Sequence, residues 1–515
     1  MNKTKTETFL FYFILLLAAF TRLYKLGEIP LGLDPDEALS GYEAFSLLTT
    51  GHDSWGYKYP LYFIFWSKGT SVLHAYLTMP LMYLFGVNAT AIRLPHAILG
   101  ILSCYVFYRL LRLMFSRPVS LFGFFLAAII PWQILLTRKG LEINIVPFFV
   151  LAGFYFFAKS IKNKDYLLLS AVFYGLGLYA YGAVWIYTAL TFGFELLYIL
   201  WYKRDKSTLL TVLTSGLIFT LFAFPIILLI LINNNFIPEI RTDYFSIPKL
   251  LEWRSHEFNF LLGTNLKRTL YLIFIGYDNH FAFAPYGIFY PISVPFILIG
   301  AYFLYKKAQK NLKTSEFSIS LCVLVNITIG FIYGLTFETG INRINFLWFF
   351  YLICIVTGLS LLITKPHWQK FIVSIYLIFF MSFYHTVLTK YNSDVAWCFT
   401  PNLKPALEIA EQAHQETSLP IKIMEMYWIH PKVLLYTKTP TDKYLATVKR
   451  QLEIESTTVA SFTHFYFNPD IDYNNIPTDA IYIAPSERLP FFHEFNTRVI
   501  GTYLVAIPKQ NTEPL

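Results

Sequence analysis

The segment Leu33-Asp34-Pro35-Asp36-Glu37-Ala38 gathers three carboxylates within four positions. A carboxylate can exchange a proton with a reacting group or cap the start of a helix. Asp34 before Pro35, with Glu37 three positions after Asp34, is typical of a capped helix N-terminus. This interpretation leaves Asp36 without a capping role. Since adjacent helix positions diverge by about 100°, Asp36 and Glu37 cannot face one atom, and we expect different roles for them.

Four basic residues are candidates for binding an anion near these acids: Lys68, Arg138, Lys139 and Arg343. Arg138 stands four positions before Glu142, so a helical ion pair explains it equally well. Arg343 opens an apolar run, where its side chain can instead extend toward lipid headgroups. Both interpretations stay open from the sequence.

The stretch Tyr277-Asp278-Asn279-His280 lies among aromatic residues, which suit sugar rings, isoprenyl chains or the membrane interface. His52 with Asp53, and Asp278 with His280, are potential metal ligands, but their spacing matches no zinc or calcium pattern. The chain also lacks a Walker loop, a dinucleotide fingerprint and a His-Glu-x-x-His motif. We therefore predict no metal and no other cofactor, with a divalent cation as the alternative.

The composition identifies the environment in which these residues must work. Hydrophobic residues make up 56% of the 515-residue chain and charged residues 14%, whereas roughly a quarter of a soluble domain is charged. The 51 Phe and 37 Tyr residues exclude a disordered chain. A net charge of +9 would suggest nucleic acid in a soluble protein, but membrane proteins concentrate Lys and Arg in cytoplasmic connections. We predict a multi-pass membrane protein with no nucleic-acid partner.

A membrane-spanning helix needs about 20 mostly apolar residues. About eleven segments qualify: 8–24, 91–113, 119–137, 145–159, 166–183, 185–201, 208–232, 288–305, 317–336, 344–363 and 371–389. Basic residues occupy every second connection, which assigns those connections to the cytoplasm. Residues 25–90, 233–287 and the chain from 390 then lie outside it. Residues 71–86 fit a helix that lies along the membrane surface.

The last part of the chain changes in character, with scattered charges and short apolar runs. We predict a mainly α transmembrane domain over residues 1–390 and a small, soluble, extracytoplasmic α/β domain over 391–515. The expected helices are 403–416 and 442–454, and the expected strands are 421–428, 460–467, 480–484 and 499–507.

Taken together, these features resemble the GT-C glycosyltransferases, above all the bacterial relatives of the protein O-mannosyltransferases and the lipid A aminoarabinose transferase. The resemblance rests on the acidic pair in the first outer segment, the surface helix, and the motifs Ala91-Ile92-Arg93-Leu94-Pro95, Pro131-Trp132, Thr137-Arg138-Lys139-Gly140-Leu141-Glu142-Ile143-Asn144 and Gly340-Ile341-Asn342-Arg343. It is densest across residues 20–160. It implies a GT-C fold and transfer of a sugar from a polyisoprenyl-phosphate carrier outside the membrane.

The resemblance also implies a role for each candidate residue. Asp36 would accept the proton of the acceptor hydroxyl as this attacks the anomeric carbon, and Glu37 would orient the acceptor or the loop. Lys68 departs from the family pattern, because Gly69-Thr70-Ser71 follows it in place of prolines. The predicted catalytic residues are thus Asp36 and Glu37, and the predicted substrate-binding residues are Arg343, Arg138, Lys68, Glu142 and His280.

We therefore predict a membrane glycosyltransferase with inverting chemistry, whose partners are a polyprenyl-phosphate-linked sugar, membrane lipids and an acceptor that is a protein, a lipid or a glycan. Two other classes compete with this prediction. A flippase for lipid-linked saccharides would place ionisable residues near the middle of the bilayer. An assembly protein without catalytic activity would act through its C-terminal domain.

Overall fold

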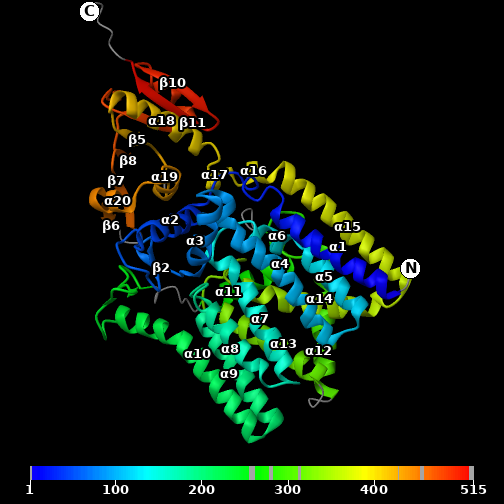
Figure 1. Cartoon of the computed structure of the whole chain (residues 1–515). Helices are drawn as coiled ribbons and strands as arrows, with labels where there is room; N and C mark the ends of the chain where they lie inside the picture. The colour runs from blue at the N-terminus through cyan, green and yellow to red at the C-terminus, as the bar shows by residue number, and fades with distance from the viewer. Residues whose placement is uncertain are drawn as a thin grey trace, which may run out of the picture.

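The computed structural model describes residues 3–253, 261–277, 282–310, 315–426, 428–452 and 457–509. Figure 1 shows a large helical body with a smaller unit of strands and helices at one end, built from the last part of the chain. The two parts correspond to the predicted membrane and α/β regions, although whether residues 391–515 fold alone stays a prediction.

The long helices of the body coincide with the predicted apolar segments. They are α1 (Lys3–Leu23), α4 (Ala89–Met114), α5 (Arg117–Ile129), α6 (Pro131–Thr137), α7 (Val146–Ser160), α8 (Tyr166–Gly177), α9 (Val184–Lys203), α10 (Lys206–Asn233), α12 (Val294–Lys310), α13 (Ser315–Gly334), α14 (Trp348–Ile363) and α15 (Pro366–Thr389). In the described part of the chain, seven spans are long and apolar enough to cross a membrane, or eight if the bent pair α5 and α6 counts as one. The mainly α membrane fold is confirmed. The count of eleven is too high by this measure, because α8 and the apolar part of α13 are short and α12 ends in a lysine-rich turn.

The predicted span 119–137 is broken in two. The axes of α5 and α6 differ by 52°, and the break falls where Pro131 starts α6. Proline has no backbone N–H to continue a helix, and it is well tolerated at the first helical position. The hydroxyl of Tyr290 donates to the carbonyl of Ile129 over 2.8 Å and so satisfies one group that the break exposes.

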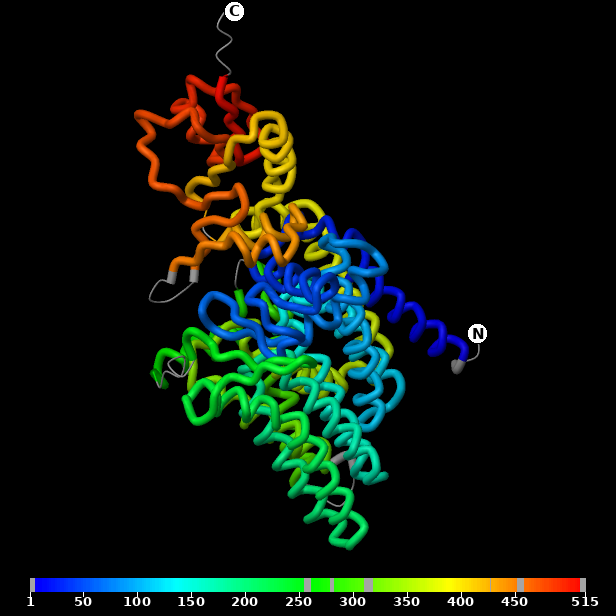
Figure 2. The backbone as a smooth tube through the Cα atoms, turned by 60° about the vertical axis from the view of Figure 1, so that its left-hand side comes forward, coloured from blue at the N-terminus to red at the C-terminus, as the bar shows by residue number. Residues whose placement is uncertain are grey.

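Segments predicted to lie outside the cytoplasm meet at one end of the helical body (Figure 2). The first contains α2 (Pro35–Thr50), the hairpin of β1 (Phe63–Phe65) and β2 (Lys68–Thr70), and α3 (Leu73–Phe85), which matches the predicted surface helix. The second contains β3 (Ile240–Arg241), β4 (Ser246–Ile247) and α11 (Leu262–Phe274). Pro60 of the first segment forms a β-bridge with Ser246 of the second.

Connections that carry basic residues contact one another elsewhere in the body. Lys203 Nζ donates to the carbonyl of Lys162 over 3.4 Å, and Arg117 pairs with Glu7 over 3.4 Å. The ammonium of Lys307 lies 4.8 Å from the centre of the Phe115 ring. The assignment of all basic connections to the cytoplasmic side stays a prediction.

The C-terminal unit is built on a seven-stranded sheet of order β10-β11-β9-β5-β8-β7-β6. Its elements are α18 (Leu403–Thr417), β5 (Ile421–Ile423), α19 (His430–Tyr436), α20 (Thr441–Thr447), β6 (Lys449–Leu452), β7 (Thr457–Phe462), β8 (Phe465–Phe467), β9 (Ile481–Pro485), β10 (Phe495–Ile500) and β11 (Tyr503–Pro508). Strand β5 is parallel to both of its neighbours, β8 and β9, and the other pairs are antiparallel. The small α/β domain is confirmed as a fold class.

Four of the predicted elements in this unit are wrong in extent. The strand expected over 421–428 ends at Ile423, and the strand expected over 460–467 consists of the end of β7 and of β8, which pair as an antiparallel hairpin. The helix expected over 442–454 ends at Thr447, because Val448 is extended and β6 then pairs with β7. The single strand expected over 499–507 is instead the hairpin of β10 and β11, turned at Gly501, whose φ is +56°. Glycine adopts this left-handed conformation at little cost, so it marks a turn within an otherwise strand-like run.

The C-terminal unit packs directly on the first outer segment. Leu33, Ala38 and Tyr42 belong to the same buried apolar cluster as Leu403, Ile423 and Val433. In addition, Tyr42 donates from its hydroxyl to the carbonyl of Thr439 over 2.9 Å. Helix α2 is therefore held between the membrane helices and the C-terminal unit.

Candidate active site

Helix α2 begins with the capping pattern that its sequence predicts. Asp34 is the N-cap residue, and its Oδ1 accepts from the backbone N–H of Asp36 over 2.9 Å. Glu37 closes the capping box, because its Oε2 accepts from the backbone N–H of Asp34 over 3.1 Å. The helix start therefore orients all three carboxylates, and the Asp36 side chain takes no part in the capping box.

Glu37 is fully buried and lies at the centre of a second set of contacts. Arg93 of α4 donates to it through Nε (3.0 Å) and Nη2 (2.8 Å), and the backbone N–H of Gly140 also donates to its Oε1. Burial alone would raise the pKa of Glu37, but Arg93 and the two backbone N–H groups outweigh it and hold this pKa below its ordinary value. Glu37 is thus a charged group that positions the loop.

Asp36 contacts the β1–β2 hairpin. Its Oδ1 accepts from the indole Nε1 of Trp66 over 2.9 Å. Trp66 and Ser67 form the two-residue turn of the hairpin, and both have positive φ values, +49° and +67°. Thr70, on the second strand, donates to Glu142 over 2.7 Å. The hairpin therefore holds the indole against Asp36, and Glu142 fastens the hairpin to the membrane helices.

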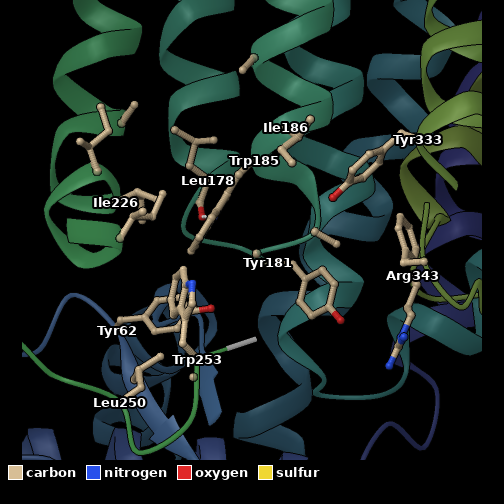
Figure 3. A pocket seen from close by; sticks show the side chains of 18 of the residues that line it. Tyr62, Leu178, Tyr181, Trp185, Ile186, Ile226, Leu250, Trp253, Tyr333 and Arg343 are labelled. Carbon is tan, nitrogen blue, oxygen red and sulfur yellow. Dashed lines mark hydrogen bonds between the residues drawn. The ribbon is translucent and has the colours of Figure 1, made fainter. Parts of the chain in front are cut away.

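The other side of this hairpin borders an apolar pocket of about 500 Å³ (Figure 3). Its walls come from the hairpin, from α8 to α10, from residues 250–253 and from the chain that follows α13. Residues that line it include Tyr62, Gly69, Tyr181, Trp185, Ile226, Leu250, Trp253, Tyr333 and Phe337. Among the described lining residues, Arg343 is the only charged one. The site therefore combines a long apolar space with a single guanidinium.

Gly69 shows how closely the hairpin and the pocket wall approach. A Cβ at this position would lie 2.1 Å from the Tyr62 ring and 2.6 Å from Leu250. Only glycine fits there without a shift of the pocket wall. This explains the Gly69 that follows Lys68, where the resembled family has proline.

Arg138 is buried among backbone carbonyls. Its side chain is 1% exposed, and its nitrogens donate to backbone carbonyls at the end of α1 and in the chain after it. The acceptors are Thr21, Arg22, Tyr24, Lys25 and Ile29. All five N–H groups are engaged with backbone carbonyls, and a role of Arg138 in substrate binding stays a prediction. The predicted ion pair with Glu142 is also absent from the described contacts of Arg138.

The remaining predicted residues are distributed as follows. Arg343 lines the pocket, and its Nη1 donates to the carbonyl of Glu338 over 3.1 Å. Lys68 is half-buried in β2, where it pairs with Phe65 across the hairpin. His280 lies outside the described residues. The structure thus brings Asp36, Glu37, Lys68 and Glu142 around the hairpin and places Arg343 at the adjoining pocket.

The C-terminal region supplies residues that the sequence analysis did not identify. Cys398 donates from its thiol to Asp34 Oδ2 over 3.0 Å. Lys432, 1% exposed, donates from Nζ to the carbonyl of Cys398 over 2.6 Å and to Thr400 Oγ1 over 3.0 Å. Burial and then the nearby Asp36 raise the pKa of Asp34 to about 6, while burial lowers the pKa of Lys432 to about 8. One available signal was Cys398, which alone among the cysteines stands outside an apolar run.

Comparison with known proteins agrees with this architecture. Residues 70–230 match the family model described as dolichyl-phosphate-mannose-protein mannosyltransferase. A search of the curated proteins found no match. ArnT from Cupriavidus metallidurans is 14% identical in the apo state and 12% identical when bound to undecaprenyl phosphate, with TM-scores of 0.55 and 0.56 and coverage of 98% of both chains in each case.

An oligosaccharyltransferase from Archaeoglobus fulgidus, tethered with an acceptor peptide, is 12% identical, with a TM-score of 0.51 over 99% of this chain and 74% of that chain. At such identities the likeness concerns the fold. This protein is thus a multi-pass membrane protein with the GT-C glycosyltransferase fold, and its residues 70–230 match the dolichyl-phosphate-mannose-protein mannosyltransferase family.

Proposed function

We propose that this protein transfers a sugar from a polyisoprenyl-phosphate donor to a hydroxyl group of an acceptor outside the cytoplasm, with Asp36 as the base. One observation carries the proposal: the same hairpin contacts both the apolar pocket and the acidic helix start. Gly69 and its neighbour in space Tyr62 line the pocket, and Trp66 at the tip of the hairpin donates to Asp36.

The pocket suits the donor. Its apolar and aromatic lining matches an isoprenyl chain, and pockets of this kind use a few polar groups to orient their ligand. Arg343 would neutralise the phosphate and the negative charge that grows on it as the sugar departs. The solved ArnT with undecaprenyl phosphate, a lipid of this class, has the same fold.

The chemistry requires a positioned base more than a strong one. The acceptor oxygen attacks the anomeric carbon, the bond from this carbon to the phosphate oxygen breaks, and the acceptor proton passes to Asp36. Displacement from the face opposite the phosphate inverts the anomeric centre. Because Asp36 sits in the first turn of α2, the helix dipole stabilises its charged form and lowers its basicity. Proton transfer is therefore late, and Trp66 fixes the carboxylate for it.

The removal of one charge from Asp36 tests this function. Asp36→Asn in purified protein is expected to abolish sugar transfer from polyprenyl-phosphate donors in detergent, while the protein still accumulates in the membrane. The matched control is Glu28→Gln, since Glu28 is exposed and lies on the same outer segment. Full activity of the Asp36→Asn protein would remove Asp36 from the mechanism.

One observation favours a transporter as a second candidate. Glu195 on α9 is fully buried among the membrane helices, and its Oε1 accepts from the hydroxyl of Tyr174 over 3.0 Å. An ionisable residue within a span is a common mark of a transport pathway. If the protein moves lipid-linked saccharide without covalent transfer, Glu195→Gln abolishes its activity and Asp36→Asn does not. Under the glycosyltransferase proposal the two variants give the reverse pattern.

A further inference from the structure

We propose that the C-terminal unit binds the carbohydrate part of the acceptor, with Trp428 as an aromatic platform beside Asp36. The inference rests on the proposed glycosyltransferase function and deepens it, because it assigns the acceptor to a chemical class. The sequence and the comparisons assign no role to Trp428.

Trp428 lies next to the indole that holds Asp36. The ring centres of Trp66 and Trp428 are 6.5 Å apart at an angle of 66°, and the His430 ring lies 5.3 Å from that of Trp66. Trp66 in turn donates to Asp36. Trp428 is 57% exposed, whereas His430 is 9% exposed. An acceptor that approaches Asp36 from the C-terminal unit therefore meets an open indole face.

Two described residues that precede Trp428, Glu425 and Met426, are bonded to side chains of neighbouring loops. Both backbone polar groups of Met426 bond to the side-chain amide of Asn468, over 2.8 and 3.0 Å. Glu425 accepts from Arg488 through two nitrogens, over 3.1 and 2.8 Å. Trp428 itself has a left-handed φ of +52°. An exposed tryptophan that holds a left-handed backbone conformation close to these bonded residues is preorganised for a ligand, because binding then costs little ordering.

The sheet topology is an independent indication of a ligand site near Trp428. Strand β5 lies between β8 and β9 and is parallel to both. Along the chain, β8 is therefore added on one side of β5, and β9 is added later on its other side. In open α/β sheets, ligands bind outside the carboxyl ends of the strands at such a switch point. The loops that leave these three carboxyl ends carry Trp428, Asn468 and Arg488. The expected ligand position of the sheet is thus the loop cluster that includes Trp428.

The surroundings favour a saccharide over a peptide. A sugar ring offers an apolar C–H face to an indole and hydroxyl groups to polar neighbours, and Glu425 and Arg488 are both partly exposed on this loop cluster. A peptide is commonly captured by a free sheet edge. Both edges of β5 are occupied, by β8 and β9. The edges of the sheet are β10 and β6.

The test measures saccharide binding by the full chain in detergent without any donor. Dye-labelled oligomannose, cello-oligosaccharide and xylo-oligosaccharide are titrated by fluorescence polarisation, with a labelled Ser/Thr-rich peptide in parallel. The wild type is expected to bind at least one saccharide, and Trp428→Ala to weaken it about tenfold or more. Trp428→Tyr should keep most of the affinity, and the control Trp368→Ala, also an exposed tryptophan, should keep all of it.

A second measurement separates this inference from the function on which it rests. Release of sugar from a polyprenyl-phosphate donor to water, in the absence of acceptor, should be unchanged in the control Trp368→Ala and lost in Asp36→Asn. If the wild type releases no sugar and transfers none, the proposed function fails, while saccharide binding still decides the role of Trp428. Equal saccharide binding by Trp428→Ala and the wild type, no saccharide binding by the wild type, or binding of the peptide alone would each overturn the inference.

Discussion

Glu37 and Arg93 form a fully buried ion pair between α2 and α4, with Nη2 to Oε2 at 2.8 Å and Nε to Oε1 at 3.0 Å. The remaining nitrogen of the guanidinium, Nη1, donates to the carbonyls of Leu26 and Pro30. The pair therefore joins the start of the acidic helix, the chain before it and a membrane helix. It therefore fixes the position of the helix start that carries Asp36.

Loss of one partner of this pair should destabilise the protein strongly. Glu37→Leu leaves the Arg93 guanidinium buried without its counter-charge, which costs roughly 3–5 kcal/mol. We expect a large drop in the apparent Tm of the detergent-solubilised protein. Glu28→Gln, which removes an exposed carboxylate paired with Lys25, should change stability by less than about 1 kcal/mol. An unchanged Tm for Glu37→Leu would contradict the structural role of the pair.

Arg343 and Arg138 should respond differently to the same substitution. Arg343→Gln removes the charged group of the pocket, so the KM for the polyprenyl-phosphate sugar should rise about tenfold or more with little change in Tm. Arg138→Gln removes donors to the end of α1, so Tm should fall while the KM for the donor is kept. Measurement of Tm and of the donor KM for both variants checks this prediction. If only Arg138→Gln raised the donor KM, Arg138 rather than Arg343 would be the donor-binding residue.

The buried acids Glu43 and Asp53 should make stability depend on pH. Burial and then the proximity of Asp53 raise the pKa of Glu43 to about 8, and burial raises the pKa of Asp53 to about 7 despite backbone hydrogen bonds. In the unfolded chain both pKa values are about 4, so the folded state holds more protons at neutral pH. Stability therefore falls as pH rises from 6.5 to 8.5.

Glu43→Gln tests this dependence. Its apparent Tm should fall less than that of the wild type between pH 6.5 and 8.5. In this range the buried His430, whose pKa burial lowers to about 3, stays neutral in the folded state and adds little. Glu408→Gln, at an exposed carboxylate of α18, should keep the wild-type slope. Parallel slopes for the wild type and Glu43→Gln would exclude Glu43 as the source.

The proposed orientation of the protein in the membrane can be tested by labelling single-cysteine variants. In a background without the four native cysteines, Asn474→Cys in the C-terminal unit should react with a membrane-impermeant maleimide in intact cells. Lys162→Cys, in a basic connection of the helical body, should react only after the membrane is opened. Both positions are exposed. The opposite pattern would place Asp36 in the cytoplasm and remove the proposed function.

Features with short-range causes were predictable from the sequence. The capped start of α2 follows from Asp34, Pro35 and Glu37, because each contact of the capping box joins residues at most three positions apart. Helix α3 and the long apolar helices follow from runs of apolar residues in the same way. The hairpin of β10 and β11 was missed although Gly501 marks its turn, since the polar residues of β10 leave only Val499 and Ile500 as an apolar signal before the reversal.

The site depended on contacts between distant parts of the chain. Arg93 belongs to the motif Ala91-Ile92-Arg93-Leu94-Pro95, but the sequence did not indicate its role. The reason is that its partner, Glu37, lies 56 positions away. Trp66 reaches Asp36 only after the hairpin has folded back, and Trp428 reaches Trp66 only when the C-terminal unit packs on α2.

The sequence by itself determined a membrane-embedded helical protein with an acidic helix start, because local periodicity and capping depend on neighbouring residues alone. The tertiary structure alone decided that Arg138 holds the end of α1, that Arg343 enters the pocket, and that the C-terminal unit stands beside Asp36. The physical reason is that the surroundings of a charged side chain are set by the elements packed against it, which no local pattern records.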